Sequence, residues 1–169
     1  DQVSVLVNNA MATAISNYVA QNYGAGRWQR IKDGVKACLI QTETLNIVMC
    51  VGIILFQNQI VRMFLTNPSE EIIRYSNQYL TTVAPFYLLL GLLVTYRTAI
   101  QSMQNAAAPF EACIIELFMR LASTCGLTLL IGYYGVCLAS PLAWIGANSL
   151  LIPVYYRMIR KAPHEEITA

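Results

Sequence analysis

The amino-acid sequence predicts an all-α bundle of membrane-spanning helices, and three observations support this prediction. Apolar residues make up 56% of the 169 residues and charged residues only 12%, which is about half of the ~25% typical of soluble domains. Several apolar stretches are about 20 residues long, the length that a helix needs to cross a bilayer. Tyrosines gather near the ends of these stretches, as in the aromatic belts at membrane interfaces.

We predict a transmembrane bundle over residues 1–161 and a polar cytoplasmic tail over residues 162–169. The first span has no charge but many small polar residues, which is typical of a helix buried among other helices. The last span also has no charge, whereas the three between them each hold one to three ionisable groups. The five spans are predicted at about residues 3–23, 37–61, 79–103, 110–132 and 136–156.

Turn and cap residues separate the predicted spans. The glycines of residues 24–26 end the first span, since glycine tolerates the positive φ of a helix terminus. Residues 67–71 (NPSEE) predict a turn, an N-cap and an acidic first turn, with a short surface helix over residues 72–78. Residues 104–109 form a tight connector, and residues 132–135 (GYYG) link the last two spans. Pro85, Pro141 and Pro153 lie inside spans and interrupt helix hydrogen bonding.

Lysines and arginines indicate the orientation of the bundle. If the spans alternate in direction, two basic groups fall on one side of the membrane, and only Arg62 and Arg74 fall on the other. Because cytoplasmic loops are enriched in Lys and Arg, we expect the C-terminus to be cytoplasmic and the protein to be multi-pass in the cytoplasmic (inner) membrane. The two basic groups are Arg27, Arg30, Lys32 and Lys36, and then Arg157, Arg160 and Lys161.

Several function classes are disfavoured by composition and motifs. A net charge of +2 without a dense basic stripe argues against nucleic-acid binding. The five cysteines are widely spaced, with no CxxC pair, and His164 is the single histidine, so no metal site is predicted. We find no signature of a hydrolase, a nucleotide-binding loop or a dinucleotide fold. We therefore predict a non-enzyme without a cofactor. The chain begins with Asp1, and we expect it to be the later part of a longer polypeptide.

Glu116 and Arg120 are the most informative ionisable residues in the predicted spans. They are four residues apart and therefore share one helix face. A charge at the bilayer centre costs roughly 2.5–3.5 kcal/mol on insertion scales, so each needs a partner or a watery cavity. The pair is either a structural ion pair or the polar wall of a substrate or ion cavity. In the second case, we expect the carboxyl group of Glu116 to exchange a proton with the substrate.

Three other polar residues are candidates for lining the same cavity. Glu43 and Gln41 lie in the first third of the second span, beside Asn46. Glu43 either stays near the lipid headgroups or pairs with an arginine, or it handles a cation or a proton. Arg97 lies near the cytoplasmic end of the third span, where it either reaches the interface with its long side chain or lines a wet cytoplasmic mouth.

Two stretches resemble a known family of transporters. Residues 14–26 (AISNYVAQNYGAG), followed by Arg30 and Lys36, resemble the end of an early helix in a lobe of a multidrug and toxic compound extrusion (MATE) transporter. The Glu116-Leu117 and Arg120 pattern, followed by residues 132–144 (GYYGVCLASPLAW), looks like the end of the second lobe of that family. The similarity covers nearly the whole chain in the right order.

This resemblance implies a two-lobe, twelve-helix fold, of which the chain would supply helices eight to twelve. It also implies export of cationic or amphipathic drugs or metabolites, in exchange for H⁺ or Na⁺, by alternating access between the lobes. The implied partners are the small-molecule substrate, membrane lipid and the N-terminal lobe of the same polypeptide. Two alternatives remain at this point. One is a lipid-linked oligosaccharide flippase of related architecture, and the other is a membrane enzyme or structural subunit.

Overall fold

The computed structural model describes residues 2–64 and 69–161, and this part of the chain is helical apart from short connections. The predicted tail at 162–169 and the Asn67-Pro68 turn lie outside the described residues. The elements are α1 (Gln2–Gly24), α2 (Trp28–Phe64), α3 (Glu70–Val83), the 3₁₀ turn η1 (Ala84–Phe86), α4 (Tyr87–Ser102), α5 (Ala107–Ile131) and α6 (Tyr133–Lys161).

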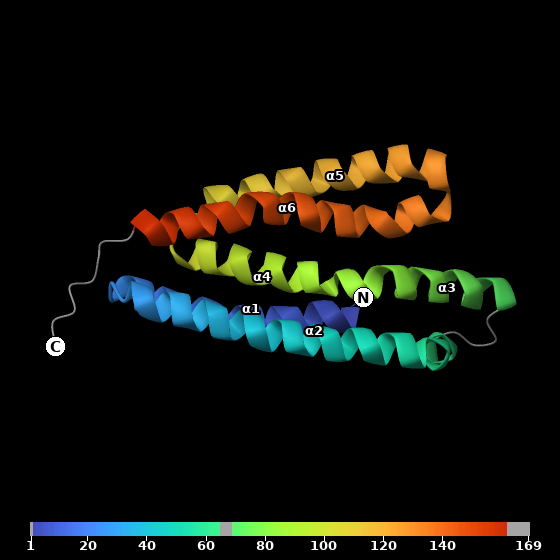
Figure 1. Ribbon diagram of the computed structural model, residues 1–169, viewed down its shortest axis with the longest axis horizontal. Helices are drawn as coiled ribbons and strands as arrows, with labels where there is room; N and C mark the ends of the chain where they lie inside the picture. Colours follow the sequence, from blue (N-terminus) through green and yellow to red (C-terminus); the bar gives the residue numbers. More distant parts are fainter. Residues whose placement is uncertain (1, 65–68, 162–169) are drawn as a thin grey trace.

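The helices run up and down beside one another in three layers (Figure 1). α1 and α2 form one outer layer, α3 and α4 continue each other in the middle, and α5 and α6 form the other outer layer. α5 and α6 make the most extensive contact, and α4 touches α1, α2 and α6. α4 is accordingly rich in buried residues. This all-α arrangement confirms the fold class predicted from the sequence.

α2 begins earlier than the sequence indicates, at Trp28 rather than near residue 37. The stretch before residue 37 is too charged to read as membrane-spanning, but it is amphipathic. Ile31 and Val35, which are one turn apart, are at most 1% exposed, whereas Lys32 and Lys36 are exposed. One apolar face is enough to hold this basic segment in the helix. The α2 backbone departs from helical geometry at Phe56 (φ −109°, ψ 16°), where the helix kinks.

The prolines have different effects on the helices. Pro85 lies in η1 and divides the third predicted span into α3 and α4, because a proline removes one helix hydrogen bond and crowds the preceding turn. Pro141 and Pro153 lie inside α6 without ending it. α3 begins at the predicted cap, where the backbone N–H of Ile72 donates to Ser69 Oγ over 3.4 Å. α3 extends to Val83, well beyond the short surface helix predicted over 72–78.

Four helical stretches of the described chain are long and apolar enough to cross a membrane. α1 is not among them, because its many polar residues lower its hydropathy, so its place as a fifth span stays a prediction. The outer face of α5 carries Phe110, Leu117 and Phe118, each more than half exposed, as expected of a surface that faces lipid or another part of a membrane protein. The four stretches are Trp28–Met63, Glu70–Ser102, Ala107–Ile131 and Tyr133–Lys161.

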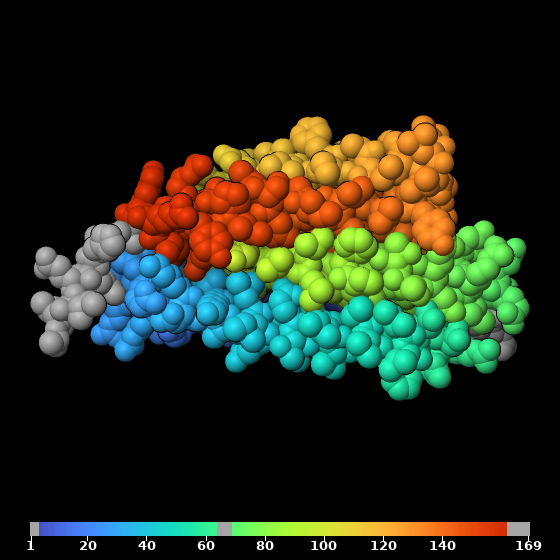
Figure 2. Space-filling view, in the orientation of Figure 1, coloured from blue at the N-terminus to red at the C-terminus, as the bar shows by residue number. Residues whose placement is uncertain are grey.

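Both basic groups lie at the same end of the bundle. The start of α2 and the end of α6 meet at the left end of Figure 1, and Figure 2 shows their surfaces adjoining there. Lys32 and Lys36 of α2 line one groove together with Tyr155 and Tyr156 of α6. The described helices therefore bring the two basic groups to one end of the bundle, as the alternating direction of the predicted spans requires.

We predict that Gly135→Ala destabilises the contact between α5 and α6. A Cβ atom at Gly135 would lie 2.5 Å from the backbone carbonyl carbon of Leu127 and 2.5 Å from the backbone nitrogen of Thr128, and a backbone cannot yield as a side chain does. The expected loss is about 1–3 kcal/mol of unfolding free energy, as for other overpacked sites. Chemical denaturation of the full-length protein in detergent measures it.

Gly126→Ala is the matched control, because a Cβ atom there meets nothing within 4 Å. Alanine is a better helix former than glycine, so this control should gain about 0.5–1 kcal/mol. Equal effects of the two substitutions would contradict close backbone packing at Gly135.

Candidate functional site

An ion-paired triad links α4 to α5. Glu116 Oε2 accepts from Arg97 Nη2 over 2.6 Å, and Glu116 Oε1 accepts from Arg120 Nη2 over 3.1 Å. The side chains of Glu116, Arg97 and Arg120 are 16%, 26% and 47% exposed, respectively. Glu116 lies nine residues into α5, roughly 14 Å from the start of that helix at 1.5 Å per residue. Both oxygens of this carboxylate are thus engaged by guanidinium groups well inside the span.

The spacing in the sequence identified the Glu116–Arg120 contact but not the contact with Arg97. Arg97 turns its guanidinium to α5, where it makes the shorter of the two ion pairs. With two arginines and one glutamate, the triad has a formal charge of +1. Because Glu116 contacts one arginine on α4 and one on α5, the geometry favours a role in holding α4 to α5.

A second polar cluster, made of Asn8, Thr42, Glu43 and Asn46, lies between α1, α2 and α4. Asn8 Nδ2 donates to Asn46 Oδ1 over 3.1 Å, and Asn46 Nδ2 donates to the backbone oxygen of Tyr87 in α4 over 3.1 Å. Asn8 also donates to the backbone oxygen of Ser4 over 2.7 Å. Asn8, Thr42 and Asn46 are at most 1% exposed, whereas Glu43 is partly exposed and only its carboxylate oxygens are buried.

Glu43 is the member of the polar cluster that lacks a hydrogen bond. Both of its carboxylate oxygens are buried, and neither has a hydrogen-bond partner among the described residues. Glu43 lies fifteen residues into α2, roughly 22 Å from the start of that helix. Because α2 begins at Trp28, Glu43 lies farther from the start of its helix than the sequence indicated, while its place in the predicted span is unchanged. The structure thus brings Glu43 together with Asn46, as the sequence indicated, but does not pair it with an arginine.

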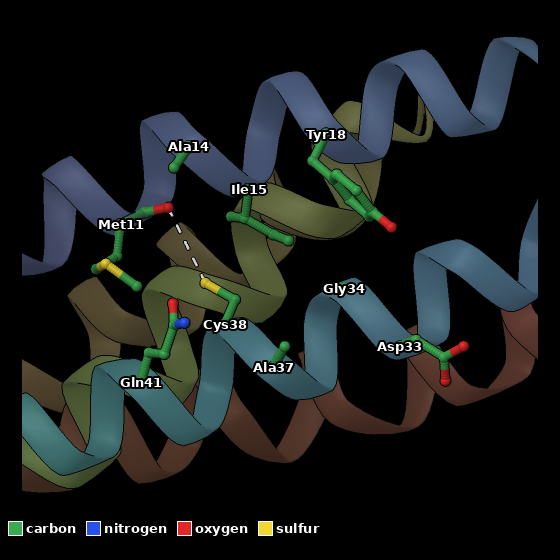
Figure 3. A pocket seen from close by; sticks show the side chains of 9 residues that line it. All are labelled: Met11, Ala14, Ile15, Tyr18, Asp33, Gly34, Ala37, Cys38 and Gln41. Carbon is green, nitrogen blue, oxygen red and sulfur yellow. Dashed lines mark hydrogen bonds between the residues drawn. The ribbon is translucent and has the colours of Figure 1, made fainter.

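Gln41 lies away from the polar cluster, in a groove of about 450 Å³ between α1 and α2 (Figure 3). Tyr18 of α1 and Gly34 of α2 face each other there, and Gly34 leaves room for the tyrosine ring. Asp33 supplies a carboxylate, and Gln29 Nε2 donates to it over 3.2 Å. The remaining lining residues are apolar or small: Met11, Ala14, Ile15, Ala37 and Cys38.

Another groove, of about 410 Å³, lies at the basic end of the bundle and combines lysines with aromatic rings. Lys32 and Lys36 of α2 line it together with Tyr96 of α4 and Tyr155 and Tyr156 of α6. The ring centroids of Tyr96 and Tyr155 are 5.1 Å apart, and those of Tyr155 and Tyr156 are 5.5 Å apart. Such a surface can accept an aromatic ring beside a negatively charged group.

Comparison with protein-family models gives a match to the MatE family over residues 2–125. This match covers most of the chain, from α1 into α5, and contains Glu43, Arg97, Glu116 and Arg120.

The chain belongs to the MatE family.

This membership confirms the family resemblance seen in the sequence, whereas placement in the second lobe stays a prediction. A curated relative, named FAD transporter, from Shewanella oneidensis is 22% identical over 144 residues. The alignment covers 84% of this chain but 31% of the relative, so the chain spans about a third of the relative's length. No solved structure matches the chain. As a MatE protein with several apolar helices, the chain is part of a multi-pass membrane protein.

Sequence reasoning missed parts of each site. Asn8 and Thr42 carry no charge and so gave no strong signal, although an asparagine inside an apolar span is itself informative. Asp33 was missed because it lies in a segment expected to be a loop. Gly91 gives no signal at all in a single sequence, yet a Cβ atom there would lie 2.7 Å from Glu43 Oε1.

We predict that Arg97→Ala destabilises the MatE protein more than Arg120→Ala. Arg97 makes the shorter bond and is less exposed than Arg120. Its loss should cost about 1–3 kcal/mol, as for hydrogen bonds to charged groups, whereas the exposed Arg120 should cost less than about 1 kcal/mol. Denaturation in detergent measures both, and in a Glu116→Gln background the difference should shrink. If Arg97→Ala and Arg120→Ala lower the unfolding free energy equally, both with Glu116 present and in the Glu116→Gln background, the triad does not tie α4 to α5.

Proposed function

We propose that the full-length protein is a secondary active transporter. It exports cationic or amphipathic drugs or metabolites in exchange for H⁺ or Na⁺, by alternating access. The observation that carries this proposal is the MatE match over the helices that hold Glu43 and Glu116, two carboxylates inside the bundle. Exchange driven by an ion gradient needs such titratable or ion-binding groups at membrane depth.

The groove between α1 and α2 supports an amphipathic cation as substrate. Its walls are mainly apolar, and it offers the Tyr18 ring and the Asp33 carboxylate, two groups that attract a cation. The N-terminal lobe of the same polypeptide would supply the opposing wall, and lipid would surround both. We place the protein in the cytoplasmic membrane, with the basic end of the bundle and the C-terminus inside, following the Lys and Arg count.

A second candidate is export of an aromatic compound that carries phosphate groups. The relative from Shewanella oneidensis is named for FAD, which combines aromatic rings with a diphosphate. The groove formed by Lys32, Lys36 and three tyrosines favours the same chemistry. The flippase alternative finds less support, because Arg97 and Arg120 are both engaged with Glu116 and are not free to meet a lipid diphosphate.

We expect the two substrate classes to separate in one transport assay. Cells that express the full-length protein should export a fluorescent cationic dye when a pH or a sodium gradient is imposed, and cells with an empty vector should not. Asp33→Asn should raise the KM for the dye by about fivefold, because an exposed charge contact is worth ~1 kcal/mol.

The matched control is Glu111→Gln, which removes an exposed carboxylate at the same end of the bundle and should leave dye export unchanged. Lys32→Gln with Lys36→Gln tests the second candidate, since it should lower export of FAD and spare the dye. Export of neither compound by well-expressed protein would contradict both proposals.

A further inference from the structure

A buried carboxyl group without a hydrogen-bond donor is the most unusual feature of the bundle. Neither oxygen of Glu43 has a partner among the described residues, and both are shielded from solvent. An ionised carboxylate in such a place loses its hydration and gains no donor in return, which is strongly unfavourable. A neutral carboxylic acid avoids most of that cost, because it carries no charge into the apolar surroundings.

The side chains beside Glu43 already make hydrogen bonds to other groups. Asn46 Nδ2 donates to the backbone oxygen of Tyr87 and, over 3.4 Å, to Asn8 Oδ1. Gly91 of α4 lies directly against the carboxyl group, so close that a Cβ atom there would come within 2.7 Å of Glu43 Oε1. The site is thus closed by a backbone on one side and by an occupied amide pair on the other.

The helices that pack on α2 bring no free positive charge to Glu43. α1 has no charged residue from Gln2 to Gly24, and η1 has none. α3 has its charged residues only within residues 70–74, in its first two turns. The one charged residue of α4, Arg97, is bound to Glu116. Two other titratable residues adjoin the polar cluster: Tyr87 of α4, whose backbone oxygen accepts from Asn46, and Cys38 of α2, whose thiol lies 3.8 Å from Thr42 Oγ1.

We propose that Glu43 carries the exchanged proton, bound to one of its carboxylate oxygens, while Glu116 serves as a fixed ion-pair partner. This inference rests on the proposed function as an ion-driven exporter. In the closed arrangement described here Glu43 holds its proton. When movement of the helices admits water, the proton passes from the carboxyl oxygen to water and leaves a carboxylate, which is then stabilised by hydration. Uptake from the opposite side of the membrane reverses this step.

A proton fits this site better than Na⁺. A sodium ion requires several oxygen ligands, but here the amide oxygens of Asn8 and Asn46 already accept hydrogen bonds from each other. A proton needs only the carboxylate itself. The polar cluster then has a simple role, because its hydrogen bonds between Asn8, Asn46 and the Tyr87 backbone fix the helices around Glu43.

Infrared spectroscopy of the full-length protein in lipid tests the proposal without relying on transport. A protonated carboxyl group in an apolar site gives a C=O band distinct from that of a carboxylate. We expect such a band near neutral pH in the native protein, and we expect it to vanish in Glu43→Gln. Glu116→Gln and the exposed control Glu111→Gln should both keep it. Persistence of the band in Glu43→Gln would overturn the assignment.

Transport in proteoliposomes provides the second readout. Glu43→Gln should lose export driven by a pH gradient, while exchange of dye across the membrane at equal pH continues. Glu43→Asp, which keeps a carboxyl group, should retain part of the coupling and guards against a folding defect. Continued pH-driven export by Glu43→Gln would overturn the proposal. If the native protein shows no carboxyl band and Glu43→Gln loses export driven by a sodium gradient, the ion exchanged at Glu43 is Na⁺ and not a proton.

The two proposals fail in different ways. If the native protein exports no substrate but its carboxyl band disappears in Glu43→Gln, the exporter function is wrong and Glu43 remains a proton-binding group. If export follows the pH gradient but is unaffected in Glu43→Gln and lost in Glu116→Gln, the function holds and the proton belongs to Glu116.

Discussion

The hydrogen-bonded junction at Asn46 holds together the half of the bundle formed by α1, α2 and α4. Inside a membrane a polar group must find its partner within the protein, because lipid tails offer none. Asn46 is completely buried and joins three helices through one amide: it pairs with Asn8 of α1 and donates to the Tyr87 carbonyl of α4. The geometry around Glu43 depends on this junction, since Asn46 and Gly91 enclose the carboxyl group.

The two carboxylates inside the bundle meet the same constraint in opposite ways. Glu116 is partnered by Arg97 and Arg120, which satisfies its charge and links α4 to α5. Glu43 has no such partner. A carboxyl group held by two arginines suits a structural contact, whereas one without a charged partner suits the proton carrier proposed above. The difference lies in the neighbours of the two residues, not in their chemical type.

The sequence predicted those features that depend on one helix at a time. Apolar length placed the ends of α1 and α5 within a few residues, and the four-residue spacing found the contact between Glu116 and Arg120. The sequence did not predict the contacts between helices. Arg97 was expected at the interface or at a cytoplasmic mouth, and nothing in its own span indicates that it binds Glu116.

The same limit applies to helix ends and to the second polar cluster. The early start of α2 at Trp28 depends on the burial of Ile31 and Val35 against neighbouring helices. The charged residues of this segment made it look like a loop in the sequence. The pairing of Asn8 with Asn46 joins residues 38 positions apart, so no local pattern reveals it. Family membership, by contrast, was visible from scattered motifs, because these recur in a fixed order along the chain.

A double-mutant cycle between Asn8 and Asn46 tests most directly the claim that this junction holds the bundle together. Unfolding free energies of the full-length protein would be measured in detergent for Asn8→Ala, Asn46→Ala and the double variant. Interhelical hydrogen bonds in membrane proteins average about 0.6 kcal/mol and reach about 1.7 kcal/mol, and we expect a coupling energy in the upper part of this range, since the pair is fully buried. Additive effects of the two substitutions would contradict the account.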